Sequence, residues 1–221
     1  MLRRLLDSPW TYFTLAGVLA LAAIASQFRL YVPSRPIGSI EDLAGLRESK
    51  PNVVFILVDT LRADRLEAYG YERPTSPILK DLADFGVRFE RVEAQSSWTK
   101  TSMASLWTGN FPTRAGLLRF GDAIPEQAKL PAEIFQEAGY TTAGIWRNGW
   151  VAPLFGFQQG FETYFRPMPQ REPAKFQKRT PGTNPLAGTD EDVTRAAISF
   201  LDTHGHEPFL LYLHYMDAHQ Y

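Results

Sequence analysis

The sequence contains no cysteine and no excess of either charge. Without cysteine, the chain forms no disulfide, no thiolate metal site and no cysteine nucleophile. Its 23 lysines and arginines balance 24 aspartates and glutamates, so composition gives no sign of a nucleic-acid-binding protein. Internal repeats are also absent. With 221 residues, of which 44% are hydrophobic, the default expectation is one globular domain beyond any targeting segment.

An uncharged stretch covers residues 8–28 near the N-terminus. Its length matches the roughly 20 residues that cross a bilayer, so segment 1–30 is predicted to be a transmembrane anchor. The alternative is a cleaved secretory signal, because Ala23-Ile24-Ala25 resembles a cleavage site. Either reading predicts that the remainder lies outside the cytoplasm, on the periplasmic or extracellular side or secreted. Residues 31–50 are expected to form a linker.

From residue 51 onward, strand-like and helix-like segments alternate. Val53–Val58 is a continuous and largely β-branched apolar run, which is typical of a strand covered on both faces in a parallel sheet. Further strands are expected at 87–92, 140–146 and 209–213, and helical segments at 76–86, 130–139 and 189–203. Segment 166–188 is expected to be a surface excursion. The alternation predicts an α/β fold with a mostly parallel central sheet flanked by helices.

Polar residues follow several of the predicted strands. Asp59 ends the first strand, Arg147 and Asn148 follow a later one, and Asp217 and His219 follow the last. In open α/β sheets, ligands bind beyond the carboxyl ends of the strands. Each residue also has an ordinary alternative as a helix cap, a loop residue or a surface ion pair. Their shared position at strand ends nevertheless favours a functional site.

Thr99 begins a helix-like segment, where a hydroxyl beside a carboxylate-held metal is a plausible nucleophile for a phosphate or sulfate ester. A bound dication lowers the pKa of coordinated water by roughly 7 to 9 units and acts on an alcohol in the same sense. The helix N-terminus adds only about 0.3 to 2 kcal/mol, so the metal dominates, and Lys100 at most assists. Oxygen ligands suggest calcium, magnesium or manganese, with zinc left open.

Five segments resemble, in order, blocks of the sulfatases and their relatives in the alkaline phosphatase superfamily. They are 51–64 with 69–77, 99–109, 139–143, 156–161 and 209–221. Segment 99–109, TKTSMASLWTG, is similar to the nucleophile signature C/S-x-P-S-R-A-S-L-L-T-G. The resemblance implies a divalent metal held by carboxylates at strand ends, a nucleophile at a helix start, and basic groups around the oxygens of the ester.

The resemblance also implies roles for single residues. Asp59 occupies the first metal-ligand position, and Thr60 stands where the family often has a second aspartate. Thr99 occupies the nucleophile position and is also a metal contact. Arg147 stands where many members carry a substrate-binding lysine, and His219 stands where the family has a histidine near the leaving-group oxygen. Asn148 and Asp217 are further implied contacts with the substrate.

Two departures from the signature change the expected chemistry. Sulfatases convert a cysteine or serine to formylglycine, and a threonine cannot give that aldehyde because its β-carbon carries a methyl group. The proline and arginine of the signature are Thr101 and Met103 here. Phosphate mono- or diester chemistry, by a hydrolase or transferase, is therefore favoured. A true sulfatase and a non-catalytic module that binds an anionic glycan remain alternatives, and glycan-linked or lipid-linked esters are the expected substrates.

The family places its remaining metal ligands in a later block, beyond Tyr221. The chain is therefore expected to be the amino-terminal portion of a longer enzyme, with little activity alone.

Overall fold

The computed structural model describes residues 9–27, 49–169 and 188–219. The chain divides into two compact units, Met1–Glu48 and Ser49–Tyr221, and each is considered by itself. Almost all of the predicted linker 31–50, and most of the predicted excursion 166–188, lie outside the described residues.

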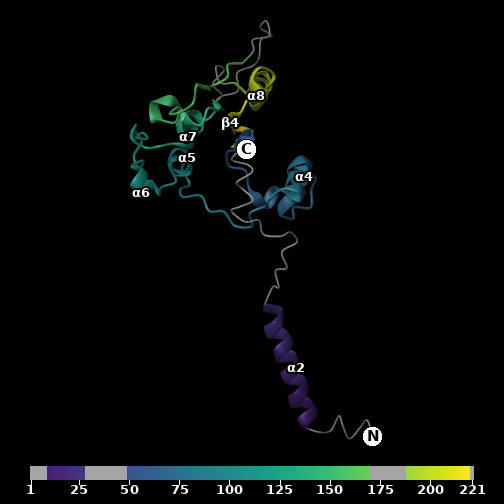
Figure 1. Cartoon of the computed structure of the whole chain (residues 1–221). Helices are drawn as coiled ribbons and strands as arrows, with labels where there is room; N and C mark the ends of the chain where they lie inside the picture. The colour runs from purple at the N-terminus through teal and green to yellow at the C-terminus, as the bar shows by residue number, and fades with distance from the viewer. Residues whose placement is uncertain (1–8, 28–48, 170–187, 220–221) are drawn as a thin grey trace, which may run out of the picture. The chain divides into compact units, whose positions relative to one another are not determined.

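The first unit contains helix α2, Pro9–Gln27, which has 19 residues (Figure 1). The prediction of a transmembrane anchor is not supported, because none of the helices among the described residues is long and apolar enough to cross a membrane. The predicted contact with a membrane depended on this helix and is likewise not supported.

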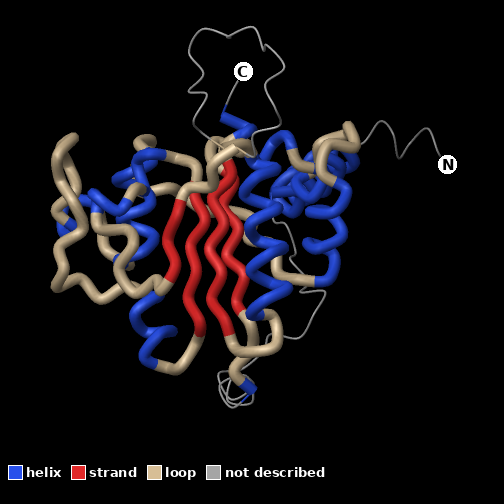
Figure 2. The backbone as a smooth tube through the Cα atoms, turned by 90° about the horizontal axis from the view of Figure 1, so that it is seen from above, coloured by secondary structure: helices blue, strands red, loops and turns tan. Residues whose placement is uncertain are grey.

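The second unit is built on a four-stranded sheet with the order β1-β4-β2-β3, in which every neighbouring pair is parallel. The strands are β1 (Val53–Val58), β2 (Thr141–Trp146), β3 (Thr163–Phe165) and β4 (Phe209–Tyr215). Figure 2 shows them side by side, with helices on both sides. The predicted parallel α/β sheet is confirmed. β3, with three residues, is too short to give a local sequence signal.

Helices α5 (Thr99–Thr108) and α8 (Asp190–His204) pack on opposite faces of the sheet. Successive side chains of a strand point to opposite faces, so Tyr212 of β4 packs with α5 while Leu211 and Leu213 pack with α8. The other described α-helices are α4 (Pro77–Phe85), α6 (Pro112–Ala115) and α7 (Pro131–Glu137). Short 3-10 helices are η1 (Ala63–Arg65), η2 (Glu67–Tyr69), η3 (Gly149–Val151), η4 (Pro153–Phe155) and η5 (Asp217–His219).

Two predictions about strands are wrong. β1 lies at the edge of the sheet, and Val54 and Ile56 on one of its faces are 48% and 58% exposed, so this strand is not covered on both faces by the described residues. Segment 87–92 forms no strand. A strand requires a hydrogen-bonded partner, whereas this segment meets the η2 loop, where the carbonyl of Phe89 accepts a hydrogen bond from the Tyr69 hydroxyl.

Candidate functional site

Four side chains from four different elements meet at the carboxyl edge of the sheet. Asp59 directly follows β1, Asn148 follows β2, Thr99 is the first residue of α5, and His214 lies near the end of β4. The strand register explains the meeting, because His214 is aligned with Leu57 of β1 and with Trp146 of β2. The Asp59 N–H donates to the Tyr215 carbonyl at 3.0 Å, which extends the β1–β4 ladder into the site.

The Asp59 carboxylate is the centre of this cluster. Its Oδ2 accepts hydrogen bonds from Asn148 Nδ2 at 2.6 Å and from Thr99 Oγ1 at 3.3 Å, and lies 3.4 Å from His214 Nε2. Burial would raise the pKa of Asp59, but the hydrogen bonds from His214 and Asn148, together with the nearby imidazoles of His214 and His219, outweigh burial and hold that pKa below its ordinary value. Asp59 is therefore a carboxylate at neutral pH, as a cation ligand must be.

Thr99 is held at the N-terminus of α5, after the N-cap residue Trp98. Its hydroxyl oxygen lies 3.4 Å from Asn148 Nδ2 in addition to its contact with Asp59. The first N–H groups of a helix lack intrahelical partners, and the helix dipole favours negative charge there. A developing negative charge on or near this oxygen is therefore stabilised by the backbone as well as by Asn148.

The orientation of Asn148 is fixed by its own loop. Its side-chain oxygen accepts a hydrogen bond from the Trp150 N–H at 2.9 Å, as the N-cap of η3. The amide nitrogen then faces Asp59 and Thr99. Asn148 was expected to be a polar substrate contact, and the structure places it between the candidate metal ligand and the candidate nucleophile.

His214 was missed by the sequence interpretation, which ended its strand at Leu213. The side chain is fully buried, and its Nδ1 lies 2.7 Å from the hydroxyl of Tyr212, which is also fully buried. Since Tyr212 is the natural donor to Nδ1, Nε2 carries the proton and donates to Asp59. The available signal was a titratable residue within an apolar strand.

Lys100 was expected at most to assist Thr99, and the structure gives its side chain other partners. Its side chain is fully buried and its ammonium donates to the carbonyl oxygens of Arg119, Phe120 and Asp122 at 2.7 to 2.8 Å. The rings of Trp98 and Phe155 lie 4.8 and 4.5 Å from Nζ. Burial lowers the pKa of this ammonium. Its charge therefore binds the loop 119–122 to the start of α5.

Arg147 is paired with carboxylates. It donates from Nη1 to Asp190 Oδ1 at 2.6 Å and to Asp217, whereas its buried Nε has no hydrogen-bond partner among the described residues. Burial lowers the pKa of Arg147, but the hydrogen bonds to Asp190 and Asp217 raise it by more, so the net shift of the pKa is upward. Asp217 therefore holds Arg147, and a substrate contact by either residue stays a prediction. His219, exposed in η5, is close enough for its charge to lower the pKa of Asp59.

Among the described residues, the Thr60 side chain forms no hydrogen bond with the side chains of the cluster. Its exposed hydroxyl donates to the Asp59 carbonyl at 2.7 Å. Its φ is 57°, in the left-handed region that β-branched residues avoid. Such strain, of order 1 to 3 kcal/mol, concentrates at functional sites.

The described residues supply only part of a metal site. Among them, no group of three or more histidine, cysteine, aspartate and glutamate side chains is placed to hold a metal ion. At the candidate site, the Asp59 carboxylate and the Thr99 hydroxyl lie 3.3 Å apart, and such oxygen ligands suit a hard cation. The oxygens of these two residues suit the expected metal, but two residues supply fewer ligands than such an ion takes.

The chain resembles known proteins in both sequence and fold. It is 36% identical to human arylsulfatase A over 134 residues, which cover 55% of this chain and 26% of the relative. A protein solved in complex with its substrate D-glucosamine-2-N,6-O-disulfate has a TM-score of 0.59 at 20% identity, covering 75% of this chain and 34% of the other. The phosphonate monoester hydrolase of Agrobacterium radiobacter has a TM-score of 0.57 at 18% identity, with coverages of 77% and 41%.

The chain thus spans about a quarter of the length of human arylsulfatase A. The sulfatase family model matches residues 51–221, which is most of the sequence and the whole of the sheet. This chain belongs to the sulfatase family.

Proposed function

We propose that the natural protein cleaves or transfers phosphate or sulfate esters and that Thr99 is its nucleophile. The observation that carries the proposal is the meeting of the Thr99 hydroxyl with the Asp59 carboxylate, 3.3 Å apart, at the N-terminus of α5. Phosphorus esters are favoured over sulfate esters because the threonine side chain cannot be oxidised to an aldehyde. The similarity in fold to a phosphonate monoester hydrolase is compatible with that preference.

Asp59 orients Thr99 and is a poor base for it. A carboxylate whose pKa lies below the ordinary value accepts a proton weakly. A bound dication would supply the missing activation by lowering the pKa of the hydroxyl. Asp59 and Thr99 would hold it, with ligands in addition to these two. The N–H groups of α5 and the amide nitrogen of Asn148 stabilise negative charge around the attacked atom.

The reaction is a displacement at phosphorus or sulfur. The Thr99 hydroxyl gives its proton to solvent water, and its oxygen forms a bond to the central atom while the bond to the ester oxygen breaks. His219, when protonated, gives a proton to the departing oxygen. Water then releases the product from Thr99 in a hydrolase, and an acceptor alcohol does so in a transferase.

The experiment compares Thr99→Val with Thr99→Ser in the complete natural protein, with nitrophenyl phosphate, bis-nitrophenyl phosphate and nitrophenyl sulfate and added Mn²⁺, Mg²⁺, Ca²⁺ or Zn²⁺. Valine keeps the shape of threonine without the hydroxyl, so kcat should fall at least about a thousandfold. Serine keeps the hydroxyl and should retain measurable turnover. Undiminished turnover in Thr99→Val would exclude Thr99 as the nucleophile.

A non-catalytic module gives a different pattern. Such a protein binds the anionic compounds but turns over none of the esters. This result holds with every added metal and for both the threonine and the serine protein. This pattern would overturn the proposal, whereas turnover of the sulfate ester above the phosphate esters would overturn only the preference for phosphorus.

A further inference from the structure

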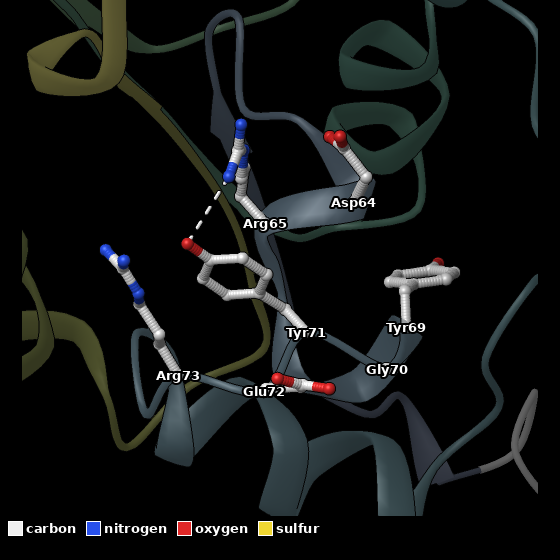
Figure 3. A pocket seen from close by; sticks show the side chains of 7 residues that line it. All are labelled: Asp64, Arg65, Tyr69, Gly70, Tyr71, Glu72 and Arg73. Atoms are coloured by element: carbon white, nitrogen blue, oxygen red, sulfur yellow. Dashed lines mark hydrogen bonds between the residues drawn. The ribbon is translucent and has the colours of Figure 1, made fainter.

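The open hollow in the loop after β1 has a volume of about 500 Å³ and is lined by residues 64, 65 and 69–73 (Figure 3). Its two acidic residues balance its two arginines, and Arg65 Nη1 donates to the Tyr71 hydroxyl at 3.3 Å. No residue of the candidate site lines this hollow. Direct contacts lead instead from the candidate site to a buried charge, the ammonium of Lys100.

The side chain of Lys100, the second residue of α5, is fully buried. An ammonium group carries three donors, and the carbonyl oxygens of Arg119, Phe120 and Asp122 accept hydrogen bonds from Nζ at 2.8, 2.7 and 2.8 Å. These bonds satisfy the charge. A buried charge is nevertheless costly to desolvate, and an apolar side chain of similar size often stabilises a fold as well or better. The position of this charge, next to Thr99 in the chain, therefore points to a role other than stability.

The turn that supplies these carbonyl groups is held on its other side by Asp122. The Oδ2 atom of Asp122 accepts hydrogen bonds from the N–H groups of Leu118 and Arg119 at 2.8 and 2.6 Å. The N–H groups of the turn therefore face a carboxylate, while its carbonyl groups face the ammonium of Lys100. Without the ammonium, these carbonyl groups would lose their donor in the interior, and the turn would have to rearrange.

The ring of Trp150 packs against three aromatic rings, and each belongs to a residue that contacts the Lys100 ammonium. The centre of the Trp150 ring lies 5.0, 4.8 and 5.7 Å from the ring centres of Trp98, Phe120 and Phe155. The rings of Trp98 and Phe155 lie 4.8 and 4.5 Å from Nζ, and Phe120 binds Nζ through its carbonyl oxygen. The ammonium therefore holds together the aromatic cage in which Trp150 lies.

Trp150 connects this cage to the candidate site. Its N–H donates to the side-chain oxygen of Asn148 at 2.9 Å. On the other side of the same planar amide group, Asn148 Nδ2 donates to Asp59 Oδ2 at 2.6 Å and lies 3.4 Å from Thr99 Oγ1. Because the amide group is rigid, the position of the Trp150 N–H determines where Nδ2 points.

We propose that Lys100 is a positioning residue for the candidate site. Its ammonium fixes the cage around Trp150, and Trp150 in turn holds the amide group of Asn148 in place. Lys100 therefore acts through other residues and not on the reacting atoms. The inference rests on the proposed function for the reaction that the site performs, whereas the orientation of Asn148 requires no turnover.

The test is the NMR signal of the Asn148 side-chain NH₂ group in the complete natural protein, identified by its loss in Asn148→Ser. A hydrogen bond of 2.6 Å to a carboxylate shifts this amide proton downfield. Lys100→Met fills the space of the lysine without its three donors, so the downfield shift should be lost. The kcat for the ester that the protein turns over should fall at least about tenfold, as is typical when a partner behind a site is removed.

Thr101→Val is the matched control, because the buried Thr101 hydroxyl also joins α5 to a backbone carbonyl, that of Leu117, at 3.1 Å. This variant should lower the unfolding free energy but leave the Asn148 signal in place and kcat within about twofold. An unchanged Asn148 signal in folded Lys100→Met overturns the proposal, and so does an equal loss of the downfield shift in Thr101→Val.

Asp122→Ala tests the same contacts with the lysine in place, and it decides the matter if Lys100→Met does not fold. It removes the carboxylate that orients the turn, so the Asn148 signal should move in the same direction, and an unchanged signal overturns the proposal. Since the NMR signal does not depend on turnover, full activity in Thr99→Val would overturn the proposed nucleophile and leave this result standing.

Discussion

At the scale of single residues, the candidate site depends on side chains buried behind it. His214 orients the Asp59 carboxylate, and Tyr212 in turn fixes the tautomer of His214. Both side chains are fully buried, so a lost hydrogen bond is not replaced by bulk water. Partners behind a candidate metal ligand set its orientation, and their loss typically costs 10- to 100-fold in metal affinity or activity.

Tyr212→Phe tests this chain of contacts. The variant should lose about 1 to 3 kcal/mol of unfolding free energy, because Nδ1 of His214 is left buried without a donor. Imidazole ¹⁵N shifts should show the Nε2–H tautomer in the unchanged protein and a mixture in the variant. Urea unfolding and turnover in the complete natural protein complete the comparison, and kcat should fall about 10- to 100-fold.

Thr142→Val is the control. The fully buried Thr142 hydroxyl donates to the Gly160 carbonyl at 2.8 Å, near the start of β2 and not at its carboxyl end. Its loss should lower stability by a comparable amount and leave the tautomer of His214 and turnover unchanged. If both variants affect turnover equally, Tyr212 acts through general stability and not through the site.

At the scale of elements, the sequence predicted features that depend on neighbouring residues and missed features that depend on residues far apart in the chain. Helix α8 was predicted correctly because its cap residue and apolar spacing are local signals. The strand predicted at 87–92 also rested on a local signal, but that segment has no partner strand in the described part of the chain. Asp59 and Asn148 were predicted to lie at one edge of the sheet because each follows a predicted strand. Lys100 was misjudged because its carbonyl partners are 19 to 22 residues away in sequence.

The start of α8 links an element to the site. Thr189 and Asp192 form a capping box, in which the Thr189 N–H donates to Asp192 Oδ2 at 2.8 Å and the Asp192 N–H donates to the Thr189 hydroxyl at 3.2 Å. The neighbouring Asp190 accepts hydrogen bonds from the backbone N–H groups of Met216 and Asp217. The capped helix start therefore holds the segment that carries His219.

Asp192→Ala should lower the unfolding free energy by about 1 kcal/mol at pH 7. The backbone N–H of Thr189 holds the pKa of Asp192 below its ordinary value. A depressed carboxyl pKa contributes stability that is present above the unfolded-state pKa of about 3.9 and is lost as the pH falls through the folded-state value. The difference between the unchanged chain and the variant, from urea unfolding between pH 7 and pH 2.5, should therefore shrink at the acid end.

Asp202→Ala provides the comparison within the same helix. Asp202 is exposed near the C-terminal end of α8, where the helix dipole disfavours a negative charge. This variant should lose no stability at pH 7. A penalty for Asp192→Ala that stays constant down to pH 2.5 would show that the carboxylate charge contributes nothing to the cap.

At the scale of the whole molecule, the site is an assembly at one edge of the sheet. The Thr99 hydroxyl, the Asp59 carboxylate and the Asn148 amide come from α5, the end of β1 and the end of β2, and they meet because parallel strands end together. The apolar residues Val54 and Ile56 of β1 remain exposed in the described part of the second unit. The edge strand thus carries the candidate metal ligand at its end and an uncovered apolar face along its length.

Metal affinity is the property that this arrangement limits most directly. Calcium takes six to eight oxygen ligands, and the described residues bring together one carboxylate and one hydroxyl at the site. The 221-residue chain should therefore bind Ca²⁺ or Mn²⁺ only weakly, with a Kd of about 10⁻⁴ M or higher. Isothermal titration of the chain measures this directly, and micromolar binding would show that the described ligands suffice.

Thr60→Asp should increase that affinity at least about tenfold, because it places a second carboxylate beside Asp59. The substitution also suits the backbone, since aspartate tolerates the φ of 57° better than threonine. Thr60→Asn is the matched control: it shares the shape and the backbone preference but adds no charge, so its affinity should stay close to that of threonine. Equal affinities for the aspartate and asparagine variants would mean that the side chain at position 60 does not reach the cation, and the metal would then have to lie on the Thr99 side of Asp59.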